Sequence, residues 1–280
     1  MNDVFLLLNG LAAEPACLVR VQSTEGSVPR EAGAWMAVFA TRIVGTIGGG
    51  HLELQAIAEA RRRLSGLPGP DCLRFALGPA LGQCCGGVVH LAFECLTAAD
   101  LSPAAGLRAR LAPHLHPVAL FGGGHVGHAL ARVLAPLPFA LTWIDSRDGV
   151  FPSNPPEGVV CEHSEPVQQA VPGLAPGTRV LIMSFSHAED LDVVASCLRR
   201  QRAQGDLPFI GLIGSRTKWA TFAHRLRERG FTPHELAQVT CPIGVPGISG
   251  KEPSVIAVAV AAQLLQTLHA PDAADKADPG

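Results

Sequence analysis

Phe121-Gly122-Gly123-Gly124-His125-Val126-Gly127 is the stretch that decides the fold of the second half of this 280-residue chain. An apolar run over 118–121 precedes it, and apolar residues continue after it at helical spacing. Its glycines match Gly-x-Gly-x-x-Gly, the pattern in which a strand turns tightly into a helix whose N-terminus can receive an anion. The stretch therefore predicts the first strand–helix unit of a Rossmann-type domain.

Strand-like and helix-like segments alternate along the rest of this half, which predicts a doubly wound parallel sheet with helices on both faces. We expect strands at 118–121, 140–145, 158–161, 179–183 and 209–213. We expect helices from His125, near Pro166, from Asp190, from Thr217 and from Pro253 to Leu268. The predicted domain covers 117–269, and 270–280 is expected to be a disordered tail.

The first hundred residues predict a separate, small α+β domain. Short strand-like runs occupy 17–22, 34–39, 42–47, 72–77 and 88–94, and a helix is expected over 51–64. Residues 101–116 have no clear strand pattern and are interpreted as a linker. The predicted fold class is thus α/β: a small N-terminal α+β domain followed by a Rossmann-like doubly wound parallel-sheet domain.

Composition excludes several function classes. The net charge is −2 and the basic residues form no long run, so neither nucleic acid nor a membrane surface is an expected partner. The N-terminus lacks a basic region ahead of its short apolar run, and the apolar run at 255–262 is too short to span a bilayer. We therefore expect a cytoplasmic protein, whose eight cysteines stay reduced.

The glycine stretch also marks the first candidate site. Gly122, Gly124 and Gly127 would let the backbone approach a phosphate, and Asp145 ends the next strand at the position of a ribose-binding acid. This predicts a nucleotide or another phosphate-bearing ligand. The alternative is that the glycines only permit close packing of strand and helix.

Two further glycine loops lie in the first half. Gly48-Gly49-Gly50 joins a strand to a helix, so it is either a second anion pocket or a plain turn. Cys84 and Cys85 stand side by side between glycines. Thiols near unpaired backbone N–H groups are candidate sulfur nucleophiles or soft metal ligands, and Cys85 is the candidate metal ligand of the two; the alternative is a thiol packed in the core.

Smaller signals follow later strands, at the edge where open α/β sheets bind ligands. Arg216 and Lys218 are candidates for holding phosphate, and otherwise form a solvated face. His187 follows another strand and is either a site residue or a loop histidine. The segment 241–244, Cys-Pro-Ile-Gly, either lines the same cleft or turns the chain, and we favour the turn.

With these motifs assembled, the chain resembles the XdhC/CoxI family of molybdenum-cofactor accessory proteins over nearly its whole length. The resemblance rests on the segments 26–30, 45–53, 82–87, 122–127, 144–147, 211–215 and 241–244 in this order. Several separate motifs in order are more specific than any one of them.

The resemblance implies a protein that binds molybdenum cofactor, or molybdopterin, and supports its sulfuration by a cysteine desulfurase. It further implies a chaperone, often a homodimer, that delivers the cofactor to the molybdenum subunit of xanthine dehydrogenase. It implies an XdhC-type N-terminal domain before the Rossmann domain, and an accessory rather than a catalytic role. Soft thiols suit molybdenum–sulfur chemistry, and glycine-rich anion loops suit the phosphate of the pterin.

Two other functions remain open from the residues. A NAD(P)-dependent oxidoreductase would use Gly122, Gly124, Gly127 and Asp145, with His125 or His187 as its acid or base. That interpretation leaves the cysteine pair unexplained. A scaffold that only bridges partners would bind no cofactor at all.

Overall fold

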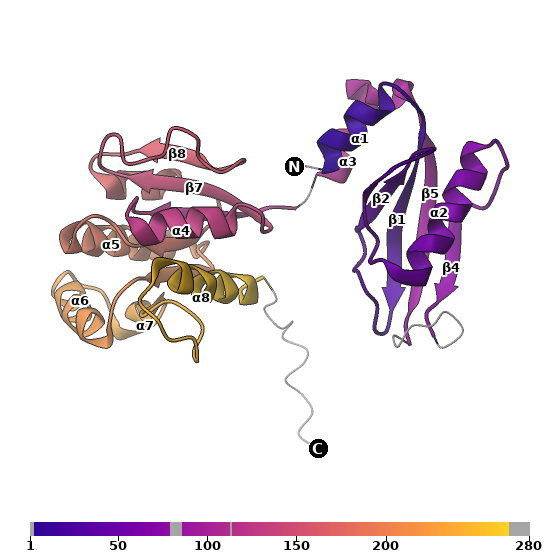
Figure 1. The fold of residues 1–280 in the computed structure, drawn as a ribbon. Helices are drawn as coiled ribbons and strands as arrows, with labels where there is room; N and C mark the ends of the chain where they lie inside the picture. Colours follow the sequence, from indigo (N-terminus) through magenta and orange to yellow (C-terminus); the bar gives the residue numbers. More distant parts are fainter. Residues whose placement is uncertain (1–2, 79–85, 113, 269–280) are drawn as a thin grey trace, which may run out of the picture. The chain divides into compact units, whose positions relative to one another are not determined.

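The chain forms two compact units that divide between residues 112 and 113. The structure is a computed structural model, and it describes residues 3–78, 86–112 and 114–268. Figure 1 shows an antiparallel sheet with helices in the first unit and a parallel sheet between helices in the second. The predicted fold class is therefore confirmed. Each unit is described by itself below.

The first unit is built on a five-stranded antiparallel sheet with the order β3-β2-β1-β5-β4. The long strand β1 is central because it pairs with β2 on one side and with β5 on the other. The strands are β1 (Ala16–Glu25), β2 (Trp35–Val38), β3 (Ile43–Gly45), β4 (Cys72–Ala76) and β5 (Val88–Leu96). All five correspond to strands that the sequence predicts.

Helix α2 (Gly50–Leu64) covers one face of this sheet. It does so because Leu52, Ala56 and Ala60 recur every four residues and form one buried stripe. Helices α1 (Asp3–Leu11) and α3 (Leu107–Leu111) share a second apolar cluster with residues of the sheet. The sequence analysis treated the start of α1 only as a short apolar run and missed this helix.

The stretch 101–116, predicted as a linker, contains regular structure. The 3₁₀ segments η2 (Ala98–Leu101) and η3 (Pro103–Ala105) lead into α3, and β6 begins at His116. Leu107 and Leu111 are buried against α1. Most of this stretch is therefore part of the first unit.

The second unit contains a six-stranded parallel sheet with the order β11-β10-β9-β6-β7-β8. Counted along the chain within this unit, the order is 6-5-4-1-2-3, which is the doubly wound Rossmann order. The direction of winding reverses between β6 and β9, so their carboxyl ends form the topological switch point. The strands are β6 (His116–Phe121), β7 (Phe139–Asp145), β8 (Val160–His163), β9 (Arg179–Ile182), β10 (Phe209–Leu212) and β11 (Val239–Thr240).

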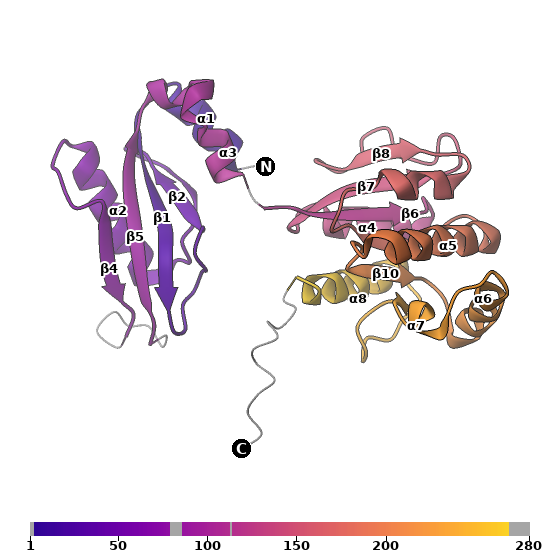
Figure 2. The same ribbon diagram turned by 180° about the vertical axis from the view of Figure 1, so that it is seen from behind.

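Helices cover both faces of this sheet, as Figures 1 and 2 show from opposite sides. Helices α4 and α8 pack together on one face, and η4, α5, α6 and α7 lie on the other. Their bounds are α4 (His125–Leu134), η4 (Val167–Gly173), α5 (His187–Gln204), α6 (Arg216–Glu228), α7 (Pro233–Leu236) and α8 (Pro253–Gln266).

Side-chain caps explain why two helices begin earlier than predicted. The hydroxyl of Ser186 accepts a hydrogen bond from Glu189 N, so α5 begins three residues before Asp190. Ser215 caps α6 in the same way, one residue earlier than expected. The helix predicted near Pro166 is the 3₁₀ segment η4. Among the described residues, no helix combines the length and apolar character that crossing a bilayer requires.

A cluster of charged side chains stabilises the C-terminal end of α2. Glu59 accepts hydrogen bonds of 2.8 Å from Arg62 and from Arg63, and the Arg63 guanidinium lies 4.4 Å from the centre of the Phe93 ring. The hydrogen bond from Arg62 lowers the pKa of Glu59, burial opposes this, and Arg63 adds to the lowering. The resulting pKa is about 2, so the ionised carboxylate stabilises the fold.

We expect Glu59→Gln to lower the free energy of unfolding at pH 7 by about 1–3 kcal/mol, as for hydrogen bonds to charged groups. Because the pKa is lower in the folded state, this contribution is complete above about 4.5 and is lost as the pH falls through about 2. Unfolding curves at pH 7, 4 and 2.5 should therefore converge for wild type and variant. Glu31→Gln, at an exposed position of the same unit, is the control. A difference that does not shrink with falling pH would contradict this assignment.

Candidate functional site

The glycine loop lies at the switch point of the parallel sheet. It follows β6, and the neighbouring strand β9 leads into Met183 and Ser184. A Cβ atom on Gly122 would lie 2.0 Å from the carbonyl oxygen of Met183, and the φ of Gly122 is +122°. Only glycine fits this turn. The loop is thus pressed against the start of the connection that follows β9.

Gly127 allows α4 to approach the loop. A Cβ atom on Gly127 would lie 2.1 Å from the carbonyl oxygen of Gly122. That oxygen also accepts a hydrogen bond of 3.0 Å from the indole of Trp143, which is fully buried in β7. The hydrogen bond from Trp143 holds the carbonyl oxygen of Gly122 in place, so this oxygen cannot move away from a larger residue at position 127.

Gly124 is the open member of the motif. A Cβ atom there would meet no atom within 4 Å, and Gly124 itself is exposed. It is the N-cap residue of α4, and no side chain among the described residues caps this helix. Free space at Gly124 and a helix N-terminus without a side-chain cap together form the arrangement that receives a phosphate or carboxylate.

Asp145 lies beneath the loop and is 2% exposed. One carboxylate oxygen accepts from Arg147 N and Nε, and the other accepts from Gly123 N and Arg147 Nη2, at distances between 2.5 and 2.9 Å. A carboxylate has about four lone-pair directions, so all of them are used. Asp145 has no acceptor capacity left for the ribose hydroxyl that the sequence analysis assigned to it.

Arg147 gains its position from this pairing. Burial would raise the pKa of Asp145, but hydrogen bonds from Arg147 and Gly123 outweigh it and hold this pKa below its ordinary value. The guanidinium carbon of Arg147 lies 4.5 Å from the ring centre of Phe185, whose side chain is 67% exposed. The two form a cationic, flat platform beside the loop, suited to a planar ring.

The connection after β9 contains an unsatisfied group. The Ser184 hydroxyl oxygen is buried and has no hydrogen-bond partner among the described residues. Ser184 N donates to Asp190 at 2.7 Å, and Asp190 also forms a buried ion pair of 2.6 Å with Lys218. Lys218 was predicted to hold phosphate; its ammonium group is already paired inside the protein.

Arg216, the other predicted cation, lines a cavity of about 390 Å³. Pro242, Ile243 and Gly244 of the Cys-Pro-Ile-Gly segment line the same cavity, so this segment does more than turn the chain. The cavity lies beyond β10 and β11, at the carboxyl edge of the sheet. The structure thus places Arg216 where the sequence expects a ligand.

The glycine loop of the first unit contains its own anion. The carboxylate of Glu53 accepts hydrogen bonds from Ile47 N at 3.0 Å, from Gly49 N at 3.2 Å and from the hydroxyl of Thr46 at 2.5 Å. Gly48 packs against Pro29, because a Cβ atom at 48 would lie 2.7 Å from Pro29 Cβ. Of the two interpretations of Gly48-Gly49-Gly50, these contacts favour a structural turn.

Ser27 and Gly87, from two of the segments that carry the family resemblance, lie against each other at one end of this sheet. Gly87 leaves no room for a Cβ atom, which would lie 2.4 Å from the carbonyl oxygen of Ser27, and Leu77 N donates to Gly87 O at 2.8 Å. The predicted cofactor and molybdenum ligands Cys84 and Cys85 lie outside the described residues.

Four of the described thiols have a raised pKa and are therefore less reactive. Burial raises the pKa of Cys17 and of Cys197 to about 12, and it also raises the pKa of Cys161 and Cys241. In the described part of the chain, no three His, Cys, Asp or Glu side chains gather in a way that would hold a metal ion. His125 and His187 are the exposed first residues of α4 and α5.

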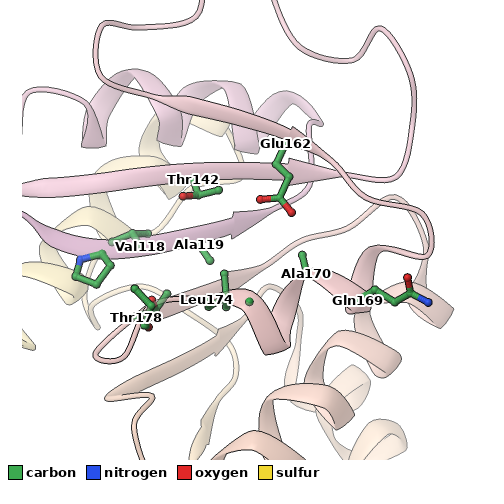
Figure 3. Close-up of a pocket in the computed structure, with 11 residues that line it drawn as sticks. Val118, Ala119, Thr142, Glu162, Gln169, Ala170, Leu174 and Thr178 are labelled. Atoms are coloured by element: carbon green, nitrogen blue, oxygen red, sulfur yellow. The ribbon is translucent and has the colours of Figure 1, made fainter.

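Figure 3 shows a different cavity, of about 260 Å³, beside the first residues of β6. Val118, Thr142 and Thr178 line it, and Glu162 points into it from β8. Of the described residues that line this cavity, Glu162 alone is ionisable. A cavity with one carboxylate and no cation does not suit a phosphorylated ligand.

Comparison with known proteins agrees with this geometry. The model of the XdhC Rossmann domain matches residues 118–264, and the model of the XdhC and CoxI family matches residues 11–75. This chain belongs to the XdhC family. The resemblance inferred from the sequence motifs is therefore confirmed, and the switch-point loop is the loop of an XdhC Rossmann domain.

Two known proteins resemble this XdhC-family chain along nearly all of its length. The uncharacterised protein YqeB of Escherichia coli is 28% identical over 260 residues, which is 90% of this chain and 43% of YqeB. The chain thus spans less than half the length of this curated relative. A crystal structure described as a xanthine dehydrogenase from Bacillus halodurans has a TM-score of 0.76 at 19% identity, covering 99% of this chain and 98% of that one. That likeness shows the shared fold.

Sequence reasoning missed the platform of Arg147 and Phe185 and the buried pair of Asp190 and Lys218. The motif Ile144-Asp145-Ser146-Arg147 contained a signal for the first, because a basic residue two positions after the acid can reach back to it. Nothing in the local sequence indicated the ion pair of Asp190 and Lys218, since these two residues lie 28 positions apart on different helices.

We expect two of the motif glycines, Gly124 and Gly127, to respond differently to alanine. Gly127→Ala should lower the free energy of unfolding by about 1–3 kcal/mol, because its Cβ meets a fixed carbonyl. Gly124→Ala should change it by no more than about 0.5 kcal/mol, because its Cβ meets open space. Urea unfolding of both variants checks this. Helix propensity alone favours alanine by about 1 kcal/mol, so a stabilised Gly127→Ala protein would disprove the close approach.

Proposed function

We propose that this XdhC-family protein binds molybdenum cofactor and delivers it to the molybdenum subunit of xanthine dehydrogenase. The observation that carries the proposal is the open glycine loop of its Rossmann domain. Gly124 leaves free space before an uncapped helix, and this is where the backbone N–H groups of α4 would bind the phosphate of the pterin.

The surroundings of the loop favour a planar, anionic ligand. On one side the platform of Arg147 and Phe185 offers a cation stacked on an aromatic ring. Two of the five guanidinium N–H groups bind Asp145, so the others remain for an acceptor on the ligand. In the same connection as Phe185, the buried Ser184 hydroxyl lacks a partner among the described residues. A molybdopterin, with a fused heterocycle and a phosphate, has these features.

The sulfuration step is part of the same proposal. A bound cofactor presents its molybdenum to a cysteine desulfurase, and the protein then hands the sulfurated cofactor to xanthine dehydrogenase as an accessory protein, in the cytoplasm and as a homodimer. Cys84 and Cys85 are the proposed thiols at the molybdenum, Cys85 first, because the described thiols with a raised pKa are poor soft ligands.

A NAD(P)-dependent oxidoreductase is the second candidate, and one observation favours a dinucleotide: the sheet has the Rossmann strand order around the loop. The saturated carboxylate of Asp145 speaks against the usual contact with a ribose. Cofactor retention by the same protein separates the two candidates.

We expect the purified protein to retain molybdenum cofactor, released from a molybdoenzyme, with a dissociation constant of about 1 μM. Gly124→Val should weaken retention at least about tenfold, since its side chain fills the space before α4. Equilibrium dialysis measures this, with NAD⁺ and NADP⁺ as competing ligands. Gly173→Ala is the control, because its Cβ also meets open space but lies in η4. No retention by the wild type, or retention of a nicotinamide nucleotide alone, would disprove the chaperone proposal.

A second prediction concerns the adjacent cysteines. We expect Cys85→Ala to release cofactor while the melting temperature stays within about 2 °C of wild type, since a thiol ligand contributes binding and not packing. Cys84→Ala should have the weaker effect. Melting and cofactor retained per folded molecule are measured on the same samples, with Cys72→Ala, an exposed thiol of β4, as the control. If both variants bind and melt like the wild type, the cysteine pair is not part of the site.

A further inference from the structure

The cavity of about 390 Å³ beyond β10 and β11 is a feature that the proposed function does not use. Its walls come from the first turn of α6, from the loop over 242–250 and from the first turns of α8, which this loop enters in Figure 1. The glycine loop of the cofactor site follows β6, and β9 lies between β6 and β10 in the sheet. The cavity is therefore a separate place on the carboxyl edge, and its volume lies in the range of about 300–1,000 Å³ that suits small molecules.

The lining of this cavity is apolar with one positive charge. Of the described residues that line it, Arg216 alone is ionisable. Lys251 and Glu252 follow the loop, carry opposite charges and do not line the cavity. Most of the apolar wall consists of Ile243, Val245, Ile248, Val255 and Ile256. A ligand that fills this cavity thus has a mainly apolar body.

The charge of Arg216 is not used inside the protein. Arg216 forms no ion pair or side-chain hydrogen bond among the described residues. By contrast, Lys218 in the same helix is paired with Asp190, and Arg200 and Arg229 of this unit are each paired with a carboxylate. The guanidinium of Arg216 therefore has donors available for an anionic group, and its planar shape matches a carboxylate.

Two helix N-termini add to the positive potential at this place. Helix α6 begins at Arg216 itself, and the first-turn residues Val255 and Ile256 of α8 line the cavity. Helix α8 also has no side-chain cap from its N-cap residue Glu252. Because a helix N-terminus carries a partial positive charge, both helices favour an anionic group here over a neutral or cationic one.

The cavity wall is preformed. Gly244 N donates to the side-chain oxygen of Gln263 at 2.7 Å, and Val245 N donates to the carbonyl of Ala259 at 3.1 Å. These bonds attach the start of the loop to α8. Ile248 nevertheless stays 45% exposed. A fixed wall lowers the cost of ordering the site when a ligand binds, and covering Ile248 removes apolar surface from water.

We propose that this cavity is a second binding site, for a small monocarboxylate with an apolar body, and that Arg216 pairs with the carboxylate. One guanidinium balances one negative charge. A phosphate dianion would leave a charge without a partner beside an apolar wall, which is costly. The ligand of this site is a molecule other than molybdenum cofactor, so the proposal goes beyond the proposed function and does not depend on it.

Two probes of the same shape test for the site, para-trifluoromethylbenzoate and its neutral amide, observed by fluorine NMR with the full chain. We expect the benzoate to bind with a dissociation constant of about 0.1–1 mM, as its size allows. The amide should bind at least about tenfold more weakly because it has no charge for Arg216. Inorganic phosphate at the same concentration should not displace the benzoate. No saturable binding of the benzoate, equal binding of the amide, or displacement by phosphate overturns the proposal.

Two variants locate the binding, each with a matched control. Arg216→Gln removes the charge, and Arg225→Gln removes a charge from an exposed position of the same helix. Ile248→Asp adds a negative charge to the wall, and Val258→Asp does so at a 52% exposed position of α8 that does not line the cavity. We expect the dissociation constant of the benzoate to rise at least about tenfold in both cavity variants and to stay within about twofold in both controls. Circular dichroism confirms that each variant is folded. Unchanged affinity in the cavity variants, or equal losses in the controls, overturns the assignment.

Discussion

The carboxylate of Asp145 beneath the glycine loop is the interaction on which the candidate site depends. It binds Gly123 N at 2.5 Å and so holds the loop at the carboxyl end of β6. It also fixes the Arg147 guanidinium, which then lies against Phe185. A buried carboxylate is stable there only because each lone pair has a donor. The loop, the platform and the entrance to α4 are therefore one connected structure.

Each unit has a glycine loop before a helix, but the N–H groups of the two loops have different partners. In the first, Glu53 binds the N–H groups of Ile47 and Gly49, and its anion occupies the place before α2 where a ligand's anion would lie. In the second, Asp145 accepts from Gly123 N alone among the N–H groups of the loop and leaves the N-terminus of α4 uncapped. A glycine loop before a helix needs an anion to satisfy its N–H groups. Where the protein supplies that anion the loop is structural, and where it does not the loop is a candidate for binding.

The carboxyl edge of the parallel sheet combines a cation on each side of one open loop. Arg147 lies on the β7 side, and Arg216 lines the cavity on the β10 side. The buried ion pair of Asp190 and Lys218 lies next to the connection after β9, because Asp190 also accepts a hydrogen bond from Ser184 N. Such an edge suits anionic ligands more than neutral ones.

The sequence by itself determined the fold class, the strands of both sheets except β11 (Val239–Thr240), and the position of the glycine loop. Local signals decide these features: alternation, helical spacing and the glycines at 122, 124 and 127 are contained in short stretches of chain. Only the tertiary structure decided the chemistry of the site. Whether Asp145 is free or saturated, whether Lys218 is paired and whether Arg216 lines a cavity depend on partners distant in sequence. Each polar side chain can form only a limited number of hydrogen bonds, and these go to the groups that folding brings near it. A local sequence pattern does not show which groups those are.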